Sequence, residues 1–169
     1  FTFINLCRVM DSGVYHFQQT HWQWLNVGFV QASAGFLFDR ISGIFALVIT
    51  GVGFLIHIFS TSYMEEEEGQ RRYFGYLSLF VASMLILVLA DNAFFMFLGW
   101  EGVGACSFAL IGHYYQKREN VAAALKAFFV TRLGDVFLVL GVLLLAMIGT
   151  VDFTRLSMFA EADLTAVHP

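Results

Sequence analysis

Four apolar stretches follow one another along most of this chain, and each is long enough to cross a membrane. They run over residues 41–63, 73–90, 93–115 and 121–148. A spanning helix needs about 20 mainly apolar residues to cross a hydrocarbon core about 30 Å thick. The last stretch is longer, which predicts a helix that is tilted or extends past the bilayer. The sequence therefore predicts a polytopic helical membrane protein.

The composition agrees with a membrane protein and excludes several other classes. Hydrophobic residues make up 59% of the chain and charged residues 13%, whereas soluble domains carry about 25% charged residues. The chain has no basic patch, so a nucleic-acid partner is not expected. Its two cysteines, Cys7 and Cys106, lack the spacing of a metal site or a disulfide framework, and Cys106 is expected to be a packing residue.

The connections between the apolar stretches are short, which predicts an all-α, up-and-down bundle of about four full spans plus a partial one. We interpret residues 1–11 as the end of a further spanning helix and residues 12–40 as an extracytoplasmic segment. A short β-hairpin is expected there between Thr20 and Asp39, with Trp22 and Trp24 on one side at the membrane interface. Residues 41–149 form the membrane domain, and residues 150–169 are expected to be an extracytoplasmic loop.

The distribution of basic residues predicts the orientation of the bundle. The two loops at 64–72 and 116–120 carry more lysine and arginine than the opposite side, which places them in the cytoplasm. The acidic run Glu65–Glu68 in the first loop is expected to be a solvated surface. Because the chain begins at Phe1 and stops at Pro169, we interpret it as a piece of a longer protein.

Four ionisable residues inside the predicted helices carry the functional information: Glu101, Lys126, Arg132 and Asp135. One such charge at the centre of a spanning helix costs about 2.5–3.5 kcal/mol on insertion scales. Arg132 and Asp135 are three residues apart and can form a buried ion pair. That pair either neutralises itself or acts as an electrostatic switch on a neighbouring group. Thr131 is placed to donate a hydrogen bond to Asp135.

Glu101 is the most informative of these charges, because its own helix offers no basic residue three or four positions away. Any partner must come from another helix. Ala105, Ala109 and Gly112 continue its face as a stripe of small residues that would let a second helix approach. A carboxyl group buried there either takes up and releases a proton or is held permanently by its partner. Lys126 lies near its helix start and either extends to the interface or takes part in charge coupling.

The remaining polar residues have simpler interpretations. Asp91 and Asn92 form a tight turn, and one of them is expected to cap the following helix. His57 and His113 lie toward helix ends and are expected to be packed or interfacial, and Trp100 is expected to belong to the core.

Several motifs resemble those of a known family and occur in the same order: Gly51–His57, Leu89–Asn92, Gly99–Gly104, Ala124–Phe128, Thr131–Asp135 and Gly149–Phe153. They are similar to the antiporter-like chain 5 family (subunit L) of proton-translocating NADH:quinone oxidoreductase, respiratory complex I. The resemblance covers essentially the region from Trp22 to Phe153. Large subunits of multi-subunit cation/proton antiporters and of membrane-bound hydrogenases share this kind of bundle and remain alternatives. A passive membrane scaffold is a third.

The resemblance implies roles for individual residues. Glu101 matches a protonatable glutamate of a half-channel that interacts with a lysine on a later helix. Arg132 and Asp135 match a pair that modulates these charges. Lys126 lies in one of the matching motifs and is kept with them as a candidate for charge coupling. The family's NADH, FMN, iron–sulfur clusters and quinone are expected in other subunits, so this chain should bind none of them. Other membrane-arm subunits and the lipid bilayer are the expected partners, in a bacterial cytoplasmic membrane rather than a mitochondrial one.

Overall fold

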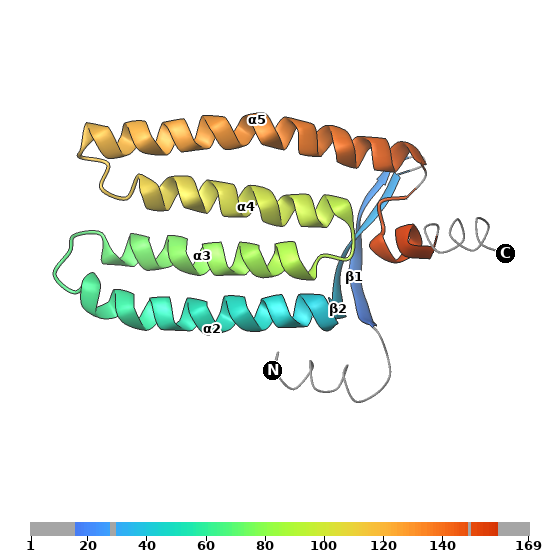
Figure 1. Ribbon diagram of the computed structural model, residues 1–169, viewed down its shortest axis with the longest axis horizontal. Coiled ribbons are helices and arrows are strands. Elements are labelled where there is room, and N and C mark those ends of the chain that lie inside the picture. The colour runs from blue at the N-terminus through green and yellow to red at the C-terminus, as the bar shows by residue number, and fades with distance from the viewer. Residues whose placement is uncertain (1–15, 28–29, 149, 159–169) are drawn as a thin grey trace.

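Four antiparallel helices lie side by side, and a two-stranded hairpin crosses one end of them (Figure 1). This computed structural model describes residues 16–27, 30–148 and 150–158. The elements are β1 (His16–Val27), β2 (Val30–Asp39), α2 (Arg40–Tyr63), α3 (Gln70–Leu89), α4 (Ala93–Ile111) and α5 (Arg118–Ile148). Within the described residues, four helices are long and apolar enough to span a membrane. The predicted bundle of four spans with a hairpin is confirmed, while the partial span at residues 1–11 lies outside the described part.

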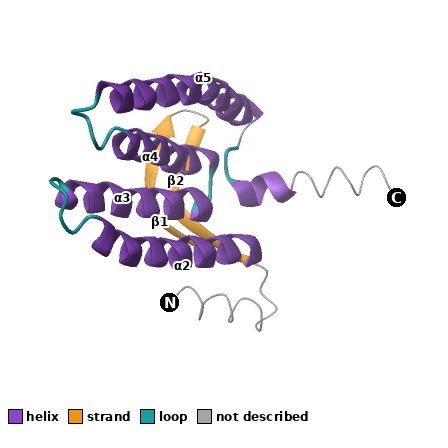
Figure 2. Cartoon of the chain, turned by 60° about the vertical axis from the view of Figure 1, so that its left-hand side comes forward, coloured by secondary structure: helices purple, strands orange, loops and turns teal. Residues whose placement is uncertain are grey.

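The helices follow chain order across the bundle, so each packs mainly on its neighbours in sequence (Figure 2). Their boundaries differ from the prediction mostly at the loop end. Helix α4 ends at Ile111 rather than near residue 115, because Gly112 caps it and residues 112–116 form a turn. Helices α3 and α5 each begin three residues earlier than expected, at Gln70 and Arg118. The Glu65–Glu68 run is exposed, as predicted.

Helices α3 and α4 approach closely because α4 presents small residues to α3. A methyl group on the Gly99 Cα would lie 2.5 Å from the Leu87 backbone nitrogen, and one on Gly102 would lie 2.5 Å from Ser83 Oγ. Cys106 continues this face and is buried, as expected of a packing residue. The predicted stripe through Ala105 does not meet a second helix among the described residues, where Ala105 is exposed. The close-packed face is therefore rotated by about one residue from the stripe that contains Glu101.

The hairpin pairs β1 with β2 in an antiparallel register that includes Thr20 opposite Gly35. It begins earlier than predicted, at His16, and two irregularities in register interrupt the alternation near Trp22. Trp22 is exposed, whereas the side chain of Trp24 lies outside the described residues. Asp39 ends the hairpin and caps α2 by accepting a 2.6 Å hydrogen bond from the Ser42 backbone N–H.

Asp91, in the turn between α3 and α4, joins the hairpin to the helices. Asn92 is the residue that caps α4, accepting a 2.9 Å hydrogen bond from the Phe95 N–H. Asp91 is fully buried and accepts a 2.7 Å hydrogen bond from the Asn92 amide. Longer bonds reach it from Gln18 on β1 and Ser33 on β2. Asp91 therefore has a structural role beyond the helix capping that the turn sequence predicts.

The segment after α5 returns to this same turn. The Phe153 N–H donates a 3.1 Å hydrogen bond to the Asp91 carbonyl, and Asn92 forms a bridge with Asp152. Residues 153–158 are helical, which corrects the expectation of a loop there. Asp152 starts this helical segment by accepting a 2.9 Å hydrogen bond from the Thr154 N–H.

Candidate functional site

Four polar side chains meet between α4 and α5 within the membrane-spanning part of the bundle. Helix α4 supplies Trp100 and Glu101, and helix α5 supplies Arg132 and Asp135. We call these four residues the α4–α5 charge cluster. Helical periodicity places Arg132 and Asp135 on one face of α5, and this face is turned toward α4.

Arg132 lies at the centre of the cluster and serves both carboxylates. Its Nη1 donates to Glu101 Oε2, forming a salt bridge between the two helices. The same nitrogen lies 3.3 Å from Asp135 Oδ2, the ion pair expected from the three-residue spacing. Arg132 is thus the partner from another helix that Glu101 was expected to need. Glu101, Arg132 and Asp135 form one group.

The three charged side chains differ in their exposure. Asp135 is the most enclosed, with 10% of its side chain exposed, compared with 25% for Arg132 and 31% for Glu101. Glu101 is therefore half-buried within the described residues rather than enclosed on all sides. Of the three charged side chains, Glu101 is the one most open to a further group, whether water or protein.

Trp100 completes the cluster by fixing Asp135. Its indole Nε1 donates a 2.7 Å hydrogen bond to Asp135 Oδ1, while Arg132 lies against the other carboxylate oxygen. The expectation that Trp100 belongs to the core is wrong, since the residue is 48% exposed among the described residues, and sequence reasoning also missed this contact. The available signal was its position directly before Glu101, where an indole N–H in an apolar helix needs an acceptor.

Two of the predicted contributors do not join the cluster. The Thr131 hydroxyl donates to the Phe128 carbonyl of its own helix at 2.9 Å, so the predicted hydrogen bond to Asp135 is wrong. Lys126 is exposed, and no salt bridge links it to another residue of the described part.

The charges in the cluster do not balance. One guanidinium faces two carboxyl groups, so the cluster carries a net charge of about −1 when both are ionised. Isolated charge is expensive to keep away from water. Arg132 also packs on the Phe128 ring, 4.6 Å from its centroid, and its Nε is buried without a hydrogen-bond partner among the described residues. Uptake of one proton by a carboxylate would bring the cluster to neutrality.

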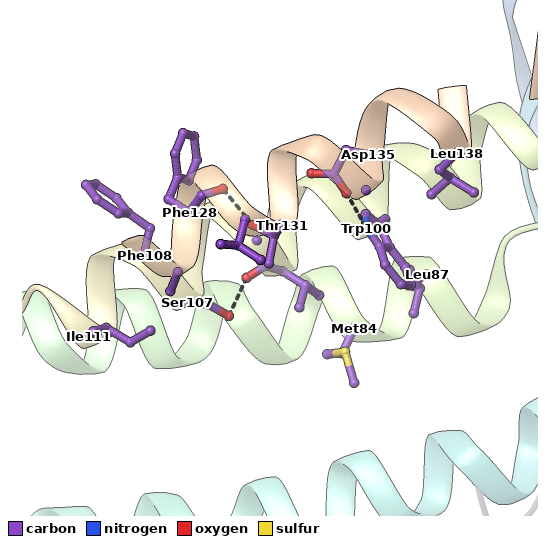
Figure 3. A pocket seen from close by; sticks show the side chains of 15 residues that line it. Met84, Leu87, Trp100, Ser107, Phe108, Ile111, Phe128, Thr131, Asp135 and Leu138 are labelled. Atoms are coloured by element: carbon purple, nitrogen blue, oxygen red, sulfur yellow. Dashed lines mark hydrogen bonds between the residues drawn. The ribbon is translucent and has the colours of Figure 1, made fainter. Parts of the chain in front are cut away.

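A cavity of about 590 Å³ runs along the groove between α4 and α5 and reaches the cluster (Figure 3). The hydrogen-bonded Trp100 and Asp135 line it toward one end, and Phe108 and Phe128 lie toward the other. The hydroxyls of Ser107 and Thr131 lie between them, each bonded to a carbonyl of its own helix. The walls are otherwise apolar, so another helix or a few waters held by these polar groups could fill this space.

The described residues contain no group of three or more His, Cys, Asp or Glu side chains that could hold a metal ion. The two histidines considered above lie away from the cluster. His57 bonds the Gly53 carbonyl at 2.7 Å and lies 3.4 Å from Ser78 Oγ. His113 is buried in the turn after α4.

Two family models match the chain. Residues 24–74 match the N-terminal part of NADH-ubiquinone oxidoreductase (complex I) chain 5, and residues 90–168 match the transmembrane region of NADH:quinone oxidoreductase and Mrp antiporter subunits. Together the two matches cover more than half of the chain. The second match contains the whole charge cluster.

Curated relatives agree with these matches. The chain is 47% identical over 152 residues to NADH-quinone oxidoreductase subunit L of Escherichia coli K12, covering 89% of this chain and 25% of that protein. It is 53% identical over 129 residues to subunit L of Buchnera aphidicola, covering 76% and 21%, respectively. For Mycobacterium tuberculosis subunit L the identity is 45% over 149 residues, covering 85% and 24%. The chain therefore spans about a quarter of the length of these relatives.

Solved structures show the same arrangement of helices. The Mrp complex from Dietzia sp. DQ12-45-1b matches with a TM-score of 0.74 and 25% identity, over 88% of this chain and 16% of that one. A chain of the membrane-bound sulfane sulfur reductase, an archaeal respiratory complex, matches with a TM-score of 0.65. At 21% identity, over 94% of this chain and 24% of that one, the second match shows the fold alone.

Proposed function

Because this chain belongs to the antiporter-like chain 5 (subunit L) family of NADH:quinone oxidoreductase, we propose that its charge cluster takes part in proton translocation across a bacterial cytoplasmic membrane. Glu101 is the group that gains and loses the proton. Arg132 and Asp135 set the electrostatic environment in which it does so. The redox chemistry belongs to other subunits of the same complex, which hold NADH, FMN, iron–sulfur clusters and quinone.

The observation that carries this proposal is the sharing of Arg132 by two carboxylates. A fixed structural pair would consist of one cation and one anion with their hydrogen bonds satisfied. In the cluster, the guanidinium faces one carboxyl group too many. Such a group responds strongly to an added charge, because charges interact far more strongly in a low dielectric than in water.

A two-state mechanism follows from the contacts. With Glu101 ionised, Arg132 is divided between Glu101 and Asp135. With Glu101 protonated, its attraction for the guanidinium falls and Arg132 is drawn toward Asp135. Trp100 holds Asp135 in place throughout, so it is Arg132 that moves. A charge arriving from a neighbouring subunit would bias this equilibrium, and proton uptake by Glu101 would follow.

The whole machinery involves partners beyond this chain. We propose that other membrane-arm subunits and the lipid bilayer cover the apolar outer faces of α2 and α5, which are largely exposed among the described residues. Lys126, exposed near the start of α5, is proposed to contribute to charge coupling only through such a neighbour. An Mrp-type antiporter subunit is the second candidate, supported by the Dietzia structure. The higher identity to the subunit L relatives favours complex I.

The test is Glu101→Gln in the intact complex, assayed in inverted membrane vesicles. Proton pumping per NADH oxidised should fall about tenfold or more, since the amide cannot take up a proton. Assembly should be normal, because Arg132 retains Asp135. Glu119→Gln is the matched control, since Glu119 is exposed in the first turn of α5. Normal pumping in Glu101→Gln would reject the proposed role of Glu101.

A further inference from the structure

Gly104 lies against the Arg132 side chain at the point where that side chain crosses from α5 to α4. A methyl group placed on the Gly104 Cα would lie 2.8 Å from Arg132 Nη2 and 3.8 Å from its Cζ. Non-bonded heavy atoms normally rest about 3.5–4.0 Å apart. The guanidinium therefore occupies space that exists only because residue 104 has no side chain.

The position of Gly104 in the helix explains why this space matters. It is three residues after Glu101 and shares its face of α4. Arg132 has to pass over this part of the helix surface to place Nη1 on Glu101 while Nη2 lies over Gly104. A side chain at residue 104 would obstruct the guanidinium without touching Glu101.

Gly104 differs from the two other glycines of α4 that make close contacts. Gly99 faces the backbone of Leu87, and Gly102 faces the short side chain of Ser83, so both are needed for α3 to pack on α4. Gly104 faces the far end of a long, flexible side chain on α5. Alanine at 104 can therefore be accommodated by moving Arg132, and the helices can stay where they are.

The displaced guanidinium has limited room. The Phe128 ring lies 4.6 Å from its Cζ, and Asp135 Oδ2 lies 3.3 Å from Nη1. Since Asp135 is held by Trp100 at 2.7 Å and its carboxylate attracts the guanidinium, we expect the displaced group to move away from Glu101 and to stay beside Asp135. We therefore expect a methyl group at 104 to shift the guanidinium relative to Glu101 while its contact with Asp135 is kept.

We infer that Gly104 is a positioning residue of the cluster, whose missing side chain makes the space through which Arg132 reaches Glu101. The expected effect on proton pumping rests on the proposed function, because Gly104 acts by maintaining the Arg132–Glu101 contact. Gly104 itself neither binds nor transfers a proton.

The experiment compares Gly104→Ala, Arg132→Lys and the double variant in the intact complex. Gly141→Ala is the matched control, since Gly141 is also in a spanning helix and a methyl group there meets nothing within 4 Å. Proton pumping per NADH oxidised is measured in inverted vesicles. A cryo-EM map of the Gly104→Ala complex reports the position of the guanidinium. Lysine has no second terminal nitrogen to collide with a methyl group at 104.

We expect Gly141→Ala to pump normally and Gly104→Ala to lose about tenfold, equivalent to about 1.4 kcal/mol. Adding Gly104→Ala to Arg132→Lys should cause no further loss, whereas a general packing defect would lower pumping equally in both backgrounds and overturn the inference. A map with the guanidinium still on Glu101 would also overturn it. A displaced guanidinium with normal pumping would leave the positioning role intact and reject the proposed function of Glu101 instead.

Discussion

The guanidinium of Arg132 on α5 donates to the carboxylate of Glu101 on α4 and joins the two helices inside the apolar bundle. Asp135 lies 3.3 Å from the same nitrogen, so one cation is shared by two acids on different helices. Neither acid can be changed without altering the position or the charge balance of Arg132. Substitutions in the cluster can separate the effects of the Arg132 charge, of its position and of the contacts that support it.

Arg132→Ala should be the most damaging single change in the cluster. It leaves two carboxyl groups close together with no cation, and removing one partner of a buried pair costs about 3–5 kcal/mol. The partial exposure of Glu101 and Arg132 makes the lower end of that range the better expectation. The amount of assembled complex on a native gel should fall. Arg132→Lys keeps the charge and should restore assembly, and equal loss in both variants would contradict the electrostatic explanation.

Asp135→Asn should assemble nearly normally. If Arg132 paired with Asp135 alone, as their spacing suggests, this substitution would leave Arg132 unpaired and impair assembly. In the structure, Arg132 keeps Glu101, and an asparagine oxygen can still accept from Trp100. With its competitor gone, Arg132 should bind Glu101 more tightly, and proton pumping should fall several-fold. A melting temperature more than about 5 °C below wild type would show that the pair mainly supports folding.

Trp100→Phe removes the indole N–H and keeps a smaller aromatic ring at this position. Asp135 Oδ1 then loses a hydrogen bond to a charged acceptor, which contributes about 1.5–3 kcal/mol. We expect the Arg132 guanidinium to move closer to Asp135 and away from Glu101. Pumping should then fall several-fold, with little change in the quantity of assembled complex. Trp22→Phe in the hairpin is a control for loss of an indole, because Trp22 is exposed. Equal effects of the two substitutions would argue against a specific role for Trp100.

The sequence predicts the helices and the hairpin well because those features depend on patterns within one segment. Apolar length alone gives the four spans, and the three-residue spacing gives the Arg132–Asp135 pair. Contacts between helices depend on the rotation of each helix about its axis, which no single segment determines. For that reason the sequence required a partner for Glu101 without identifying Arg132.

The same limit explains the predictions that are wrong. The small-residue face of α4 passes through Gly99 and Gly102, one position away from the face chosen around Glu101. A shift of one residue is about 100° around a helix. It is enough to leave Ala105 on the exposed side of α4 rather than on the packed side. Thr131 bonds its own helix, because a hydroxyl can satisfy itself locally on a carbonyl three or four residues earlier.

Asp91→Ala should destabilise the attachment of the hairpin to the bundle. It removes an acceptor used by Asn92 at 2.7 Å and, more weakly, by Gln18 and Ser33. Loss of a hydrogen bond to a charged acceptor costs about 1.5–3 kcal/mol, although the Asn92 amide keeps its bond to the Ser33 carbonyl. Limited proteolysis should cleave the hairpin faster, while Asp91→Asn, which keeps one oxygen, should be intermediate. Unchanged proteolysis in Asp91→Ala would show that the backbone contacts alone hold the hairpin.

His113 should make the loop end of the bundle sensitive to acid. The imidazole is buried in the turn after α4, between the rings of Tyr73 and Tyr114. Burial lowers the pKa of His113 from its ordinary value of 6.5, the Arg72 guanidinium lowers it further, and Glu67 partly opposes both. The folded protein therefore binds this proton at a lower pH than the unfolded chain does.

The sign of the effect on stability follows from that pKa. Above pH 6.5 the imidazole is mostly neutral in both states, and its contribution is fully present. As the pH falls below 6.5, the unfolded chain takes up the proton first, so stability is lost progressively until the folded protein is protonated too. The melting temperature of the intact complex should therefore fall more steeply from pH 7 to pH 5.5 in wild type than in His113→Gln, which does not titrate. Parallel curves for the two proteins would show that another group controls the acid sensitivity of this end.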